Sequence, residues 1–295
     1  MKSNLKAHAA VLGTNLFFAA NFSLVKKVYP ALVKPFGLNI FRVSISLVLF
    51  WILWLFSGKP AGIARKDIGR FLLCGLTGIA INQMLFIKGL TLTSTIHASL
   101  LMLTTPLLIT IFALWVLKET LTPFKIAGLL LGAGGATLLI TAKETGTHAP
   151  HYLLGDLLIL INAVSYAVYF ILVKPLMLRY SPLHVVRWVF TFGLLLILPL
   201  GWSEATQVSF PSFSALQLVA FFSIIFTGTF LAYSFNAYGL QHLGAGVTGS
   251  YIYTQPVFAV AIATVFFQEA LSPGKLMAAA LIFSGVFLAG RKKAN

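Results

Sequence analysis

Charged side chains are scarce in this sequence, and acidic side chains are the scarcest. Only 9% of the 295 residues are charged, and six Asp and Glu stand against 21 Lys and Arg. A soluble domain carries about 25% charged residues, so this composition excludes a water-facing globular fold. The hydrophobic content of 59% likewise excludes an intrinsically disordered chain.

Cysteine is nearly absent too, and the single Cys74 allows neither an internal disulfide nor a cysteine-based metal cluster. The sequence has no Gly-rich phosphate loop, zinc signature or catalytic triad on a plausible scaffold. We therefore expect no cofactor, no bound metal and no ATP-driven pump. Nucleic acid is not an expected partner, because the Lys and Arg are spread thinly between apolar runs and form no basic face.

Long uncharged runs dominate what is present. A membrane-spanning helix needs about 20 mainly apolar residues, and the runs accommodate ten such helices with short connections. The sequence predicts an all-α polytopic membrane protein, with the lipid bilayer as its solvent. The ten transmembrane helices are expected at 8–27, 37–57, 68–88, 95–117, 123–141, 153–173, 183–201, 214–238, 246–267 and 273–290.

The chain contains an internal duplication. A shift of 150 residues aligns 89–138 with 239–288, giving 12 identities in 50 positions that include Pro106 with Pro256. Matched prolines at a single offset are not expected by chance in leucine-rich helices. The duplication also argues that the first helix is retained, although Lys2 and Lys6 before an apolar stretch resemble a signal peptide.

The duplication divides the chain into a first repeat at 1–142, a linker at 143–152 and a second repeat at 153–295. Each repeat has five helices, an odd number, so the second enters the membrane with the opposite orientation. We therefore expect two inverted five-helix repeats. Secondary transporters use this arrangement for alternating access, with the substrate site near the membrane midplane.

Basic residues predict the orientation. With both termini cytoplasmic, 14 Lys and Arg fall on the cytoplasmic half and seven on the other. This bias agrees with the positive-inside rule. The loop at 26–34, which carries three lysines, argues against it.

A motif before the fifth helix of each repeat identifies a resemblance. It reads Glu119-x-Leu121-Thr122-Pro123-x-Lys125 and Glu269-x-Leu271-Ser272-Pro273-x-Lys275. With ten helices in two repeats and a proline in each fourth helix, the chain resembles the EamA-type branch of the drug/metabolite transporter superfamily over nearly its whole length. The resemblance implies a location in the cytoplasmic (inner) membrane, a central cavity and often export. It does not name a substrate, because such proteins are known for amino acids, other metabolites, sugars and drugs.

Polar and aromatic residues that share a helical face are candidates to line the cavity. Buried amides are costly in lipid, so they tend to face a bundle interior; the alternative is that they only join helices by hydrogen bonds. Asn82 in the third helix belongs with them. The candidate cavity residues are Thr14, Phe18, Asn21, Gln83, Thr105, Asn162, Tyr166, Tyr169, Tyr233, Asn236, Tyr251 and Gln255.

Three basic residues are candidate contacts for an anionic substrate: Arg42, Arg187 and Lys88. Arg42 and Arg187 match across the repeats, and the favoured interpretation is that each extends to a headgroup or a carbonyl. His97, at the start of the fourth helix, is expected at the membrane interface. All six carboxylates fall at expected helix ends or loops, which disfavours a buried-acid proton relay.

Pro106 and Pro256 lie inside expected helices, where each removes a backbone hydrogen bond. Each is either a static bend or a gating hinge.

The function predicted is secondary transport of a small polar or amphipathic, amino-acid-like metabolite, most simply as an exporter. The alternative substrate class is an organic anion. A membrane-embedded enzyme is disfavoured because only His148 and His151 offer paired catalytic groups, and they lie in the linker. A scaffold or receptor is a third alternative. The chain is expected to act as a monomer or a homodimer.

Overall fold

The computed structural model describes residues 2–29, 32–56, 61–117, 123–141, 151–268 and 272–289. The regular structure within these ranges is helical throughout, without strands. The α-helices are α1 (Lys2–Val28), α2 (Pro35–Leu55), α3 (Ile68–Gly75), α4 (Ile81–Leu92), α5 (Thr95–Leu101), α6 (Thr104–Leu117), α7 (Pro123–Thr141), α8 (Tyr152–Met177), α9 (Pro182–Ala205), α10 (Ala215–Ile225), α11 (Ala232–Ser250), α12 (Thr254–Phe267) and α13 (Pro273–Ala289).

The all-helical prediction is confirmed for these residues, and the count of ten spans is supported in part. Seven helical segments of the described chain are long and apolar enough to cross a membrane. Three shorter apolar helices, Thr95–Ile109, Ile126–Gly135 and Leu276–Gly285, coincide with the expected fourth, fifth and tenth spans. The motif residues Glu119 and Glu269 and most of the linker lie outside the described residues.

Two spans contain a π-helical turn at corresponding places in the two halves. Leu76–Ala80 joins α3 to α4, and Phe226–Leu231 joins α10 to α11, 150 residues further on. A π-helical turn inserts one extra residue into a helix and is often found at functional sites. These turns bring Gly78 against the Tyr169 ring and Gly228 against the Asn21 side chain.

The fourth and ninth spans are interrupted rather than smoothly bent. A short turn at Met102 and Leu103 separates α5 from α6, and a 3-10 turn at Tyr251–Tyr253 precedes α12. Pro106 and Pro256 are each the third residue of the following helix, where a missing N–H costs little. The expectation of prolines in helix interiors is therefore corrected, because the interruptions lie upstream of both.

The expected eighth and ninth helices leave residues 239–245 between them, but most of this connection is helical. Helical structure continues to the end of that segment, and the chain departs from it at Gly244, where φ is +78°. Only glycine adopts this backbone conformation without a steric penalty.

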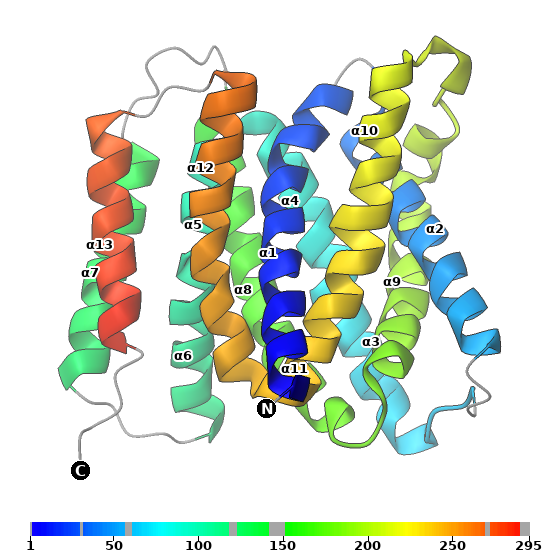
Figure 1. Cartoon of the computed structure of the whole chain (residues 1–295), viewed down its shortest axis with the longest axis horizontal. Helices are drawn as coiled ribbons and strands as arrows, with labels where there is room; N and C mark the ends of the chain where they lie inside the picture. The colour runs from blue at the N-terminus through cyan, green and yellow to red at the C-terminus, as the bar shows by residue number, and fades with distance from the viewer. Residues whose placement is uncertain are drawn as a thin grey trace.

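Helices from the two halves pack against one another in matched pairs. α2 contacts α9, α7 contacts α13, and α1 contacts α11 and α12, while α8 contacts α4 and α6. In Figure 1, α2 descends on the right and α9 rises beside it, so these counterparts run in opposite directions. The α7–α13 pair forms one end of the molecule, where Gly135 and Gly285 let the backbones approach closely.

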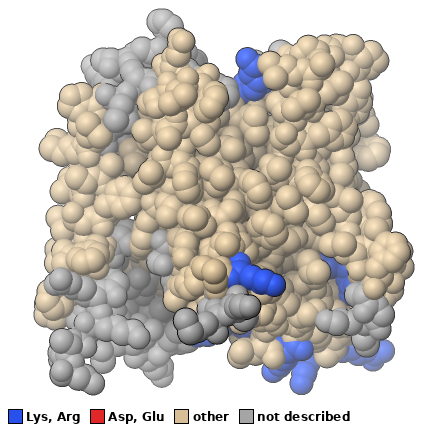
Figure 2. All heavy atoms as spheres, viewed as in Figure 1, with Lys and Arg blue, Asp and Glu red and all other residues tan. Residues whose placement is uncertain are grey.

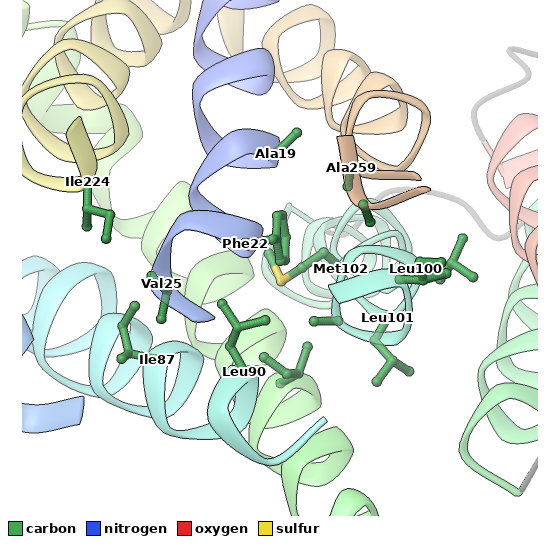
Figure 3. Packing of buried hydrophobic residues seen from close by; sticks show 14 of the residues in the cluster. Ala19, Phe22, Val25, Ile87, Leu90, Leu100, Leu101, Met102, Ile224 and Ala259 are labelled. Atoms are coloured by element: carbon green, nitrogen blue, oxygen red, sulfur yellow. The ribbon is translucent and has the colours of Figure 1, made fainter. Parts of the chain in front are cut away.

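Buried apolar side chains form two clusters. The first surrounds Phe22 of α1, which lies beside Met102 and above Leu90 and Val25 (Figure 3). The second gathers around Phe190 of α9.

Large apolar side chains also cover the outside of the bundle. Figure 2 shows this face as almost wholly uncharged, with Lys and Arg mostly at the end where α1 begins and fewer at the opposite end. Such a surface suits a bilayer.

Candidate functional site

A small cavity lies at the centre of the bundle, between α1, α2, α4, α8, α11 and α12. Its volume of about 50 Å³ is room for a few water molecules. The lining combines amides, aromatic rings and one guanidinium group. The lining residues are Phe18, Asn21, Phe22, Arg42, Asn82, Gln83, Phe86, Met102, Asn162, Tyr166, Tyr233 and Gln255.

Most of the cavity candidates from the sequence lie in this lining, and five lie behind it. Tyr169 packs on the Gly78 turn and stacks with Tyr166 at a centroid distance of 6.0 Å. Thr14 donates to the Ala232 carbonyl, joining α1 to α11. Thr105 and Asn236 are also buried outside the lining.

Tyr251, the fifth of these, lies beside the beginning of α1, away from the cavity. Its hydroxyl is 2.8 Å from Nδ1 of His8 on α1. This contact fixes the turn before α12 against the beginning of α1. It places Tyr251 in helix packing rather than in the cavity.

Phe22, Phe86 and Met102 line the cavity but were missed from the sequence. Each is an apolar residue within an apolar helix, and in sequence it does not differ from a core residue. Phe22 and Phe86 contact edge to face, with centroids 5.2 Å apart. They form an apolar wall within the lining.

Hydrogen bonds between the two halves hold the polar lining. Gln83 of α4 donates to the Tyr233 hydroxyl on α11 at 3.0 Å. Asn82 and Asn162 each donate to the other's backbone carbonyl, across α4 and α8. Gln255 of α12 donates to Oδ1 of Asn15 on α1 at 2.7 Å. The polar side chains therefore join helices, as the alternative interpretation of the sequence expected, while several of them also line the cavity.

Arg42 is the charged group of the cavity lining. Its side chain is 2% exposed, and Nε donates to Oγ1 of Thr229 at 3.0 Å. Thr229 lies in the second π-helical turn and donates its own proton to the Ile224 carbonyl five residues earlier. This leaves the threonine lone pairs directed at Arg42. The expectation that Arg42 extends to a headgroup is corrected, because the guanidinium is enclosed within the bundle.

The Arg42 guanidinium has hydrogen-bonding capacity left over. Nη1 is buried without a hydrogen-bond partner, and no described carboxylate lies within salt-bridge distance of it. An isolated buried charge is expensive, so such groups are normally paired.

Three amide oxygens of the same lining also lack partners: Oδ1 of Asn21, Oε1 of Gln83 and Oδ1 of Asn162. The cavity thus offers one cationic donor and several neutral acceptors.

The other two basic candidates lie away from the cavity. Arg187 is 1% exposed near the beginning of α9, with its guanidinium against the rings of Trp51 and Trp54. Lys88 is half-buried on α4 and is not part of the lining.

Asp156 and His97 form a buried pair that was not anticipated. Asp156 lies in the second turn of α8 with 0% exposure, and its Oδ2 is 3.0 Å from Nδ1 of His97 on α5. Thr93 donates to the other carboxylate oxygen at 2.5 Å. His97 is 0% exposed, so its side chain is enclosed by neighbouring helices rather than directed to the outer surface. Asp156 does lie near a helix end, as predicted, but its burial was missed.

The part of the chain that the structure describes contains no cluster of metal-ligating side chains. Within those ranges, no group of three or more His, Cys, Asp or Glu side chains could hold an ion.

Comparison with known proteins indicates the family of the chain. The model of the EamA-like transporter family matches residues 5–141 and again 153–291. A protein of Bacillus subtilis (strain 168) named "Uncharacterized transporter YetK" is 26% identical, covering 98% of this chain and 86% of the relative. A "Probable terminal-alkyne amino-acid exporter" of Streptantibioticus cattleyicolor is 28% identical, covering 87% of this chain and 84% of its own length.

A solved structure titled "Crystal structure of protein" has the same fold, with a TM-score of 0.67, 22% identity and 96% coverage of both chains. The relatives' names point to a transporter rather than an enzyme, and the apolar helices to a multi-pass membrane protein. The family model covers most of the sequence in two matches. The chain therefore belongs to the EamA-like transporter family.

Proposed function

We propose that this chain is a secondary transporter that exports a small zwitterionic, amino-acid-like metabolite by alternating access. The observation that carries the proposal is the buried Arg42 guanidinium, which faces the central cavity with Nη1 unpaired. A substrate carboxylate would supply the missing acceptor, and charge-assisted hydrogen bonds of this kind are about twice as strong as neutral ones.

The amide oxygens supply the second half of a zwitterion site. Oδ1 of Asn21, Oε1 of Gln83 and Oδ1 of Asn162 are buried acceptors in the same lining. An ammonium group is a donor of three hydrogen bonds, so it complements such a set. The Phe22 and Phe86 wall would then accommodate an apolar substrate side chain. The similarity to a probable amino-acid exporter supports this substrate class.

Alternating access is supported by the paired construction of the two halves. The π-helical turns, the interrupted helices and the opposed directions of α2 and α9 recur between them. We infer an inverted pair of five-helix repeats, at 1–142 and 153–295 with a linker at 143–152. The cavity of about 50 Å³ would have to widen for a substrate to enter, and rocking of one repeat against the other would do this.

The positive-inside rule supports a cytoplasmic position for both termini. Exposed basic side chains are more numerous toward the end of the bundle where α1 begins than at the opposite end, which carries Lys27 and Lys34. Those at the α1 end are Lys6, Arg65, Lys66, Arg70, Lys174 and Arg179. With that end in the cytoplasm of a cell with an inner membrane, a metabolite made inside would reach the cavity from the basic side.

Counterflow in proteoliposomes tests the proposal. The purified chain is reconstituted, the lumen is loaded with one unlabelled amino acid at a time, and uptake of the same labelled amino acid is followed. We expect uptake above empty liposomes for at least one zwitterion, and its loss in Arg42→Gln. Lys174→Gln, which removes an exposed positive charge from α8, should transport normally. Equal uptake by Arg42→Gln and the parent protein would contradict the proposal.

An organic anion is the second candidate, because Arg42 would bind a carboxylate whether or not an ammonium group accompanies it. N-acetylation separates the two classes, since it removes the ammonium charge and keeps the carboxylate. A zwitterion site should prefer the free amino acid, and Asn21→Leu should reduce that preference. A preference for the acetylated form in the parent protein would favour the anion carrier.

A further inference from the structure

A second pocket lies at the edge of the bundle, between the end of α2 and the beginning of α9. Its lining is part polar and part apolar, and Arg187 forms its floor. This pocket is separate from the central cavity, with which it shares no lining residue. The lining residues are Phe50, Leu53, Trp54, Ser181, Leu183, His184 and Arg187.

The Arg187 guanidinium is held by contacts on several sides, and one of its N–H donors has no hydrogen-bond partner. Its guanidinium carbon lies 4.5 Å from the centroid of the Trp51 ring and 4.9 Å from that of Trp54. Nη2 donates to the Ala61 carbonyl at 3.0 Å and lies 3.3 Å from Nδ1 of His184. Nε is buried without a partner. No described carboxylate neutralises this charge, since the two ion pairs that the structure shows are elsewhere.

The residues around the pocket are of the kind found at the membrane interface. Trp188 donates to the Ala61 carbonyl, so three indole rings gather around the end of α2. Tryptophan is enriched at the level of the lipid headgroups. Leu53 and Leu183, at the mouth of the pocket, are 41% and 43% exposed, and they continue it into the apolar outer surface.

The net charge near the pocket is positive. Ser181 and Leu183 also line a wider groove between α1, α9 and α11, in which Lys6 lies. The same end of the bundle carries the exposed Arg65 and Arg70, whereas the charge of Arg179 there is offset by its ion pair with Asp67. Basic pockets between membrane helices on the cytoplasmic side are typical sites for anionic lipid headgroups.

We propose that this pocket binds one anionic phospholipid, with the headgroup phosphate on Arg187 and the acyl chains along Leu53 and Leu183. The phosphate oxygens would accept from Nε, and the Ser181 hydroxyl lies in the same lining to assist. An apolar mouth next to a buried cation favours a lipid over free phosphate, because only the lipid fills both parts. The site is independent of the substrate proposed for the central cavity.

Native mass spectrometry of the full chain in detergent tests the site. The delipidated protein is titrated with phosphatidylglycerol or phosphatidylcholine, and the bound lipid is counted. We expect one phosphatidylglycerol to bind at least about tenfold more tightly than phosphatidylcholine, because both present a phosphate to Arg187 but only phosphatidylcholine also brings a cation into this basic site. Arg187→Gln should abolish the preference, and Lys66→Gln, which removes an exposed charge from the same end, should retain it.

A second variant separates lipid binding from folding. Leu53→Trp narrows the mouth from the lipid side and leaves Arg187 intact, so it should fold and bind phosphatidylglycerol more weakly. Inorganic phosphate at the same concentration should not displace the lipid. Equal binding of the two lipids, an undiminished preference in Arg187→Gln, or displacement by inorganic phosphate would each overturn the proposal.

Discussion

The carboxylate of Asp156 on α8 lies 3.0 Å from Nδ1 of His97 on α5, and both side chains are enclosed within the bundle. The contact joins the beginning of the second half of the chain to the interrupted fourth span. Gly89 and Gly155 approach closely beside it, so that a Cβ on either would meet the backbone of the other. The two halves are thus tied together by a polar contact in a place with little room.

Removing the Asp156 carboxylate should destabilise the protein. Asp156→Ala leaves His97 and Thr93 without their acceptor, and breaking a buried pair in this way costs about 3 kcal/mol. Thermal unfolding in detergent would measure the loss. A double-mutant cycle with His97→Ala should give a coupling of at least about 1 kcal/mol. Additive effects of the two substitutions would show that the pair does not act as a unit.

The ion pair of Arg179 with Asp67 provides the matched comparison. Its distance is 2.7 Å, but the Arg179 side chain is 52% exposed, whereas Asp67 is nearly buried. An exposed pair contributes about 1 kcal/mol or less. Arg179→Ala should therefore shift the unfolding temperature much less than Asp156→Ala, because the Tyr180 hydroxyl still donates to the Asp67 carboxylate after the arginine is removed.

Glu204 at the end of α9 caps the beginning of the neighbouring helix α2. Its Oε2 accepts from the backbone N–H groups of Phe36 at 2.7 Å and Gly37 at 3.0 Å. Glu204→Ala should cost about 1–2 kcal/mol, as loss of a helix cap does, and Glu204→Gln less because an acceptor remains. Denaturant or thermal unfolding measures both. Gln207→Ala, which removes only an exposed contact with Lys34, is the control; an equal loss there would contradict the capping role.

These contacts mark the limit of what the sequence predicts. Hydropathy located the apolar helical segments, because bilayer thickness sets the length of an apolar run, but it did not predict their interruptions or the extension of α11 to Ser250. The pairing of Asp156 with His97 was out of reach, since it depends on how α5 and α8 pack and the two residues are 59 positions apart. The same holds for Glu204, whose partners on α2 precede it by 167 and 168 positions.

The candidate cavity shows the same division. Helical periodicity brought Asn162 and Tyr166 to the lining correctly, because residues four apart share a face. It also selected Tyr169 and Thr14, which lie behind the lining, since one face of a helix contacts several neighbours. Arg42 is positioned by its hydrogen bond to Thr229, which lies in a π-helical turn of the other half of the chain. No sequence pattern predicted that turn.

Two glycines on α7 should respond in opposite ways to alanine. A Cβ on Gly135 would lie 2.9 Å from the Ala278 carbonyl oxygen on α13, whereas a Cβ on Gly134 would meet nothing within 4 Å. Gly135→Ala should push the helices apart at a cost of about 1–3 kcal/mol. Gly134→Ala should be neutral, or stabilising by up to about 1 kcal/mol through helix propensity. Thermal unfolding in detergent would compare them, and equal effects would show that close packing of α7 on α13 is unimportant.

The prolines of the interrupted spans should govern turnover rather than stability, if the chain transports as proposed. Pro256 is the third residue of α12 and keeps the turn before it from continuing as α-helix, because a proline cannot donate to the carbonyl four residues earlier and its ring crowds that carbonyl. In Pro256→Ala, we expect the 3-10 turn between α11 and α12 to become α-helical. The loss of this interruption would stiffen the span and slow the change between inward- and outward-facing states. We expect stability and substrate affinity to change little and counterflow rate to fall by about tenfold, as hinge substitutions often alter a conformational step.

Pro199→Ala, in the exposed part of α9, is the matched control and should leave the rate unchanged. An unaltered counterflow rate in Pro256→Ala would assign this proline a static role.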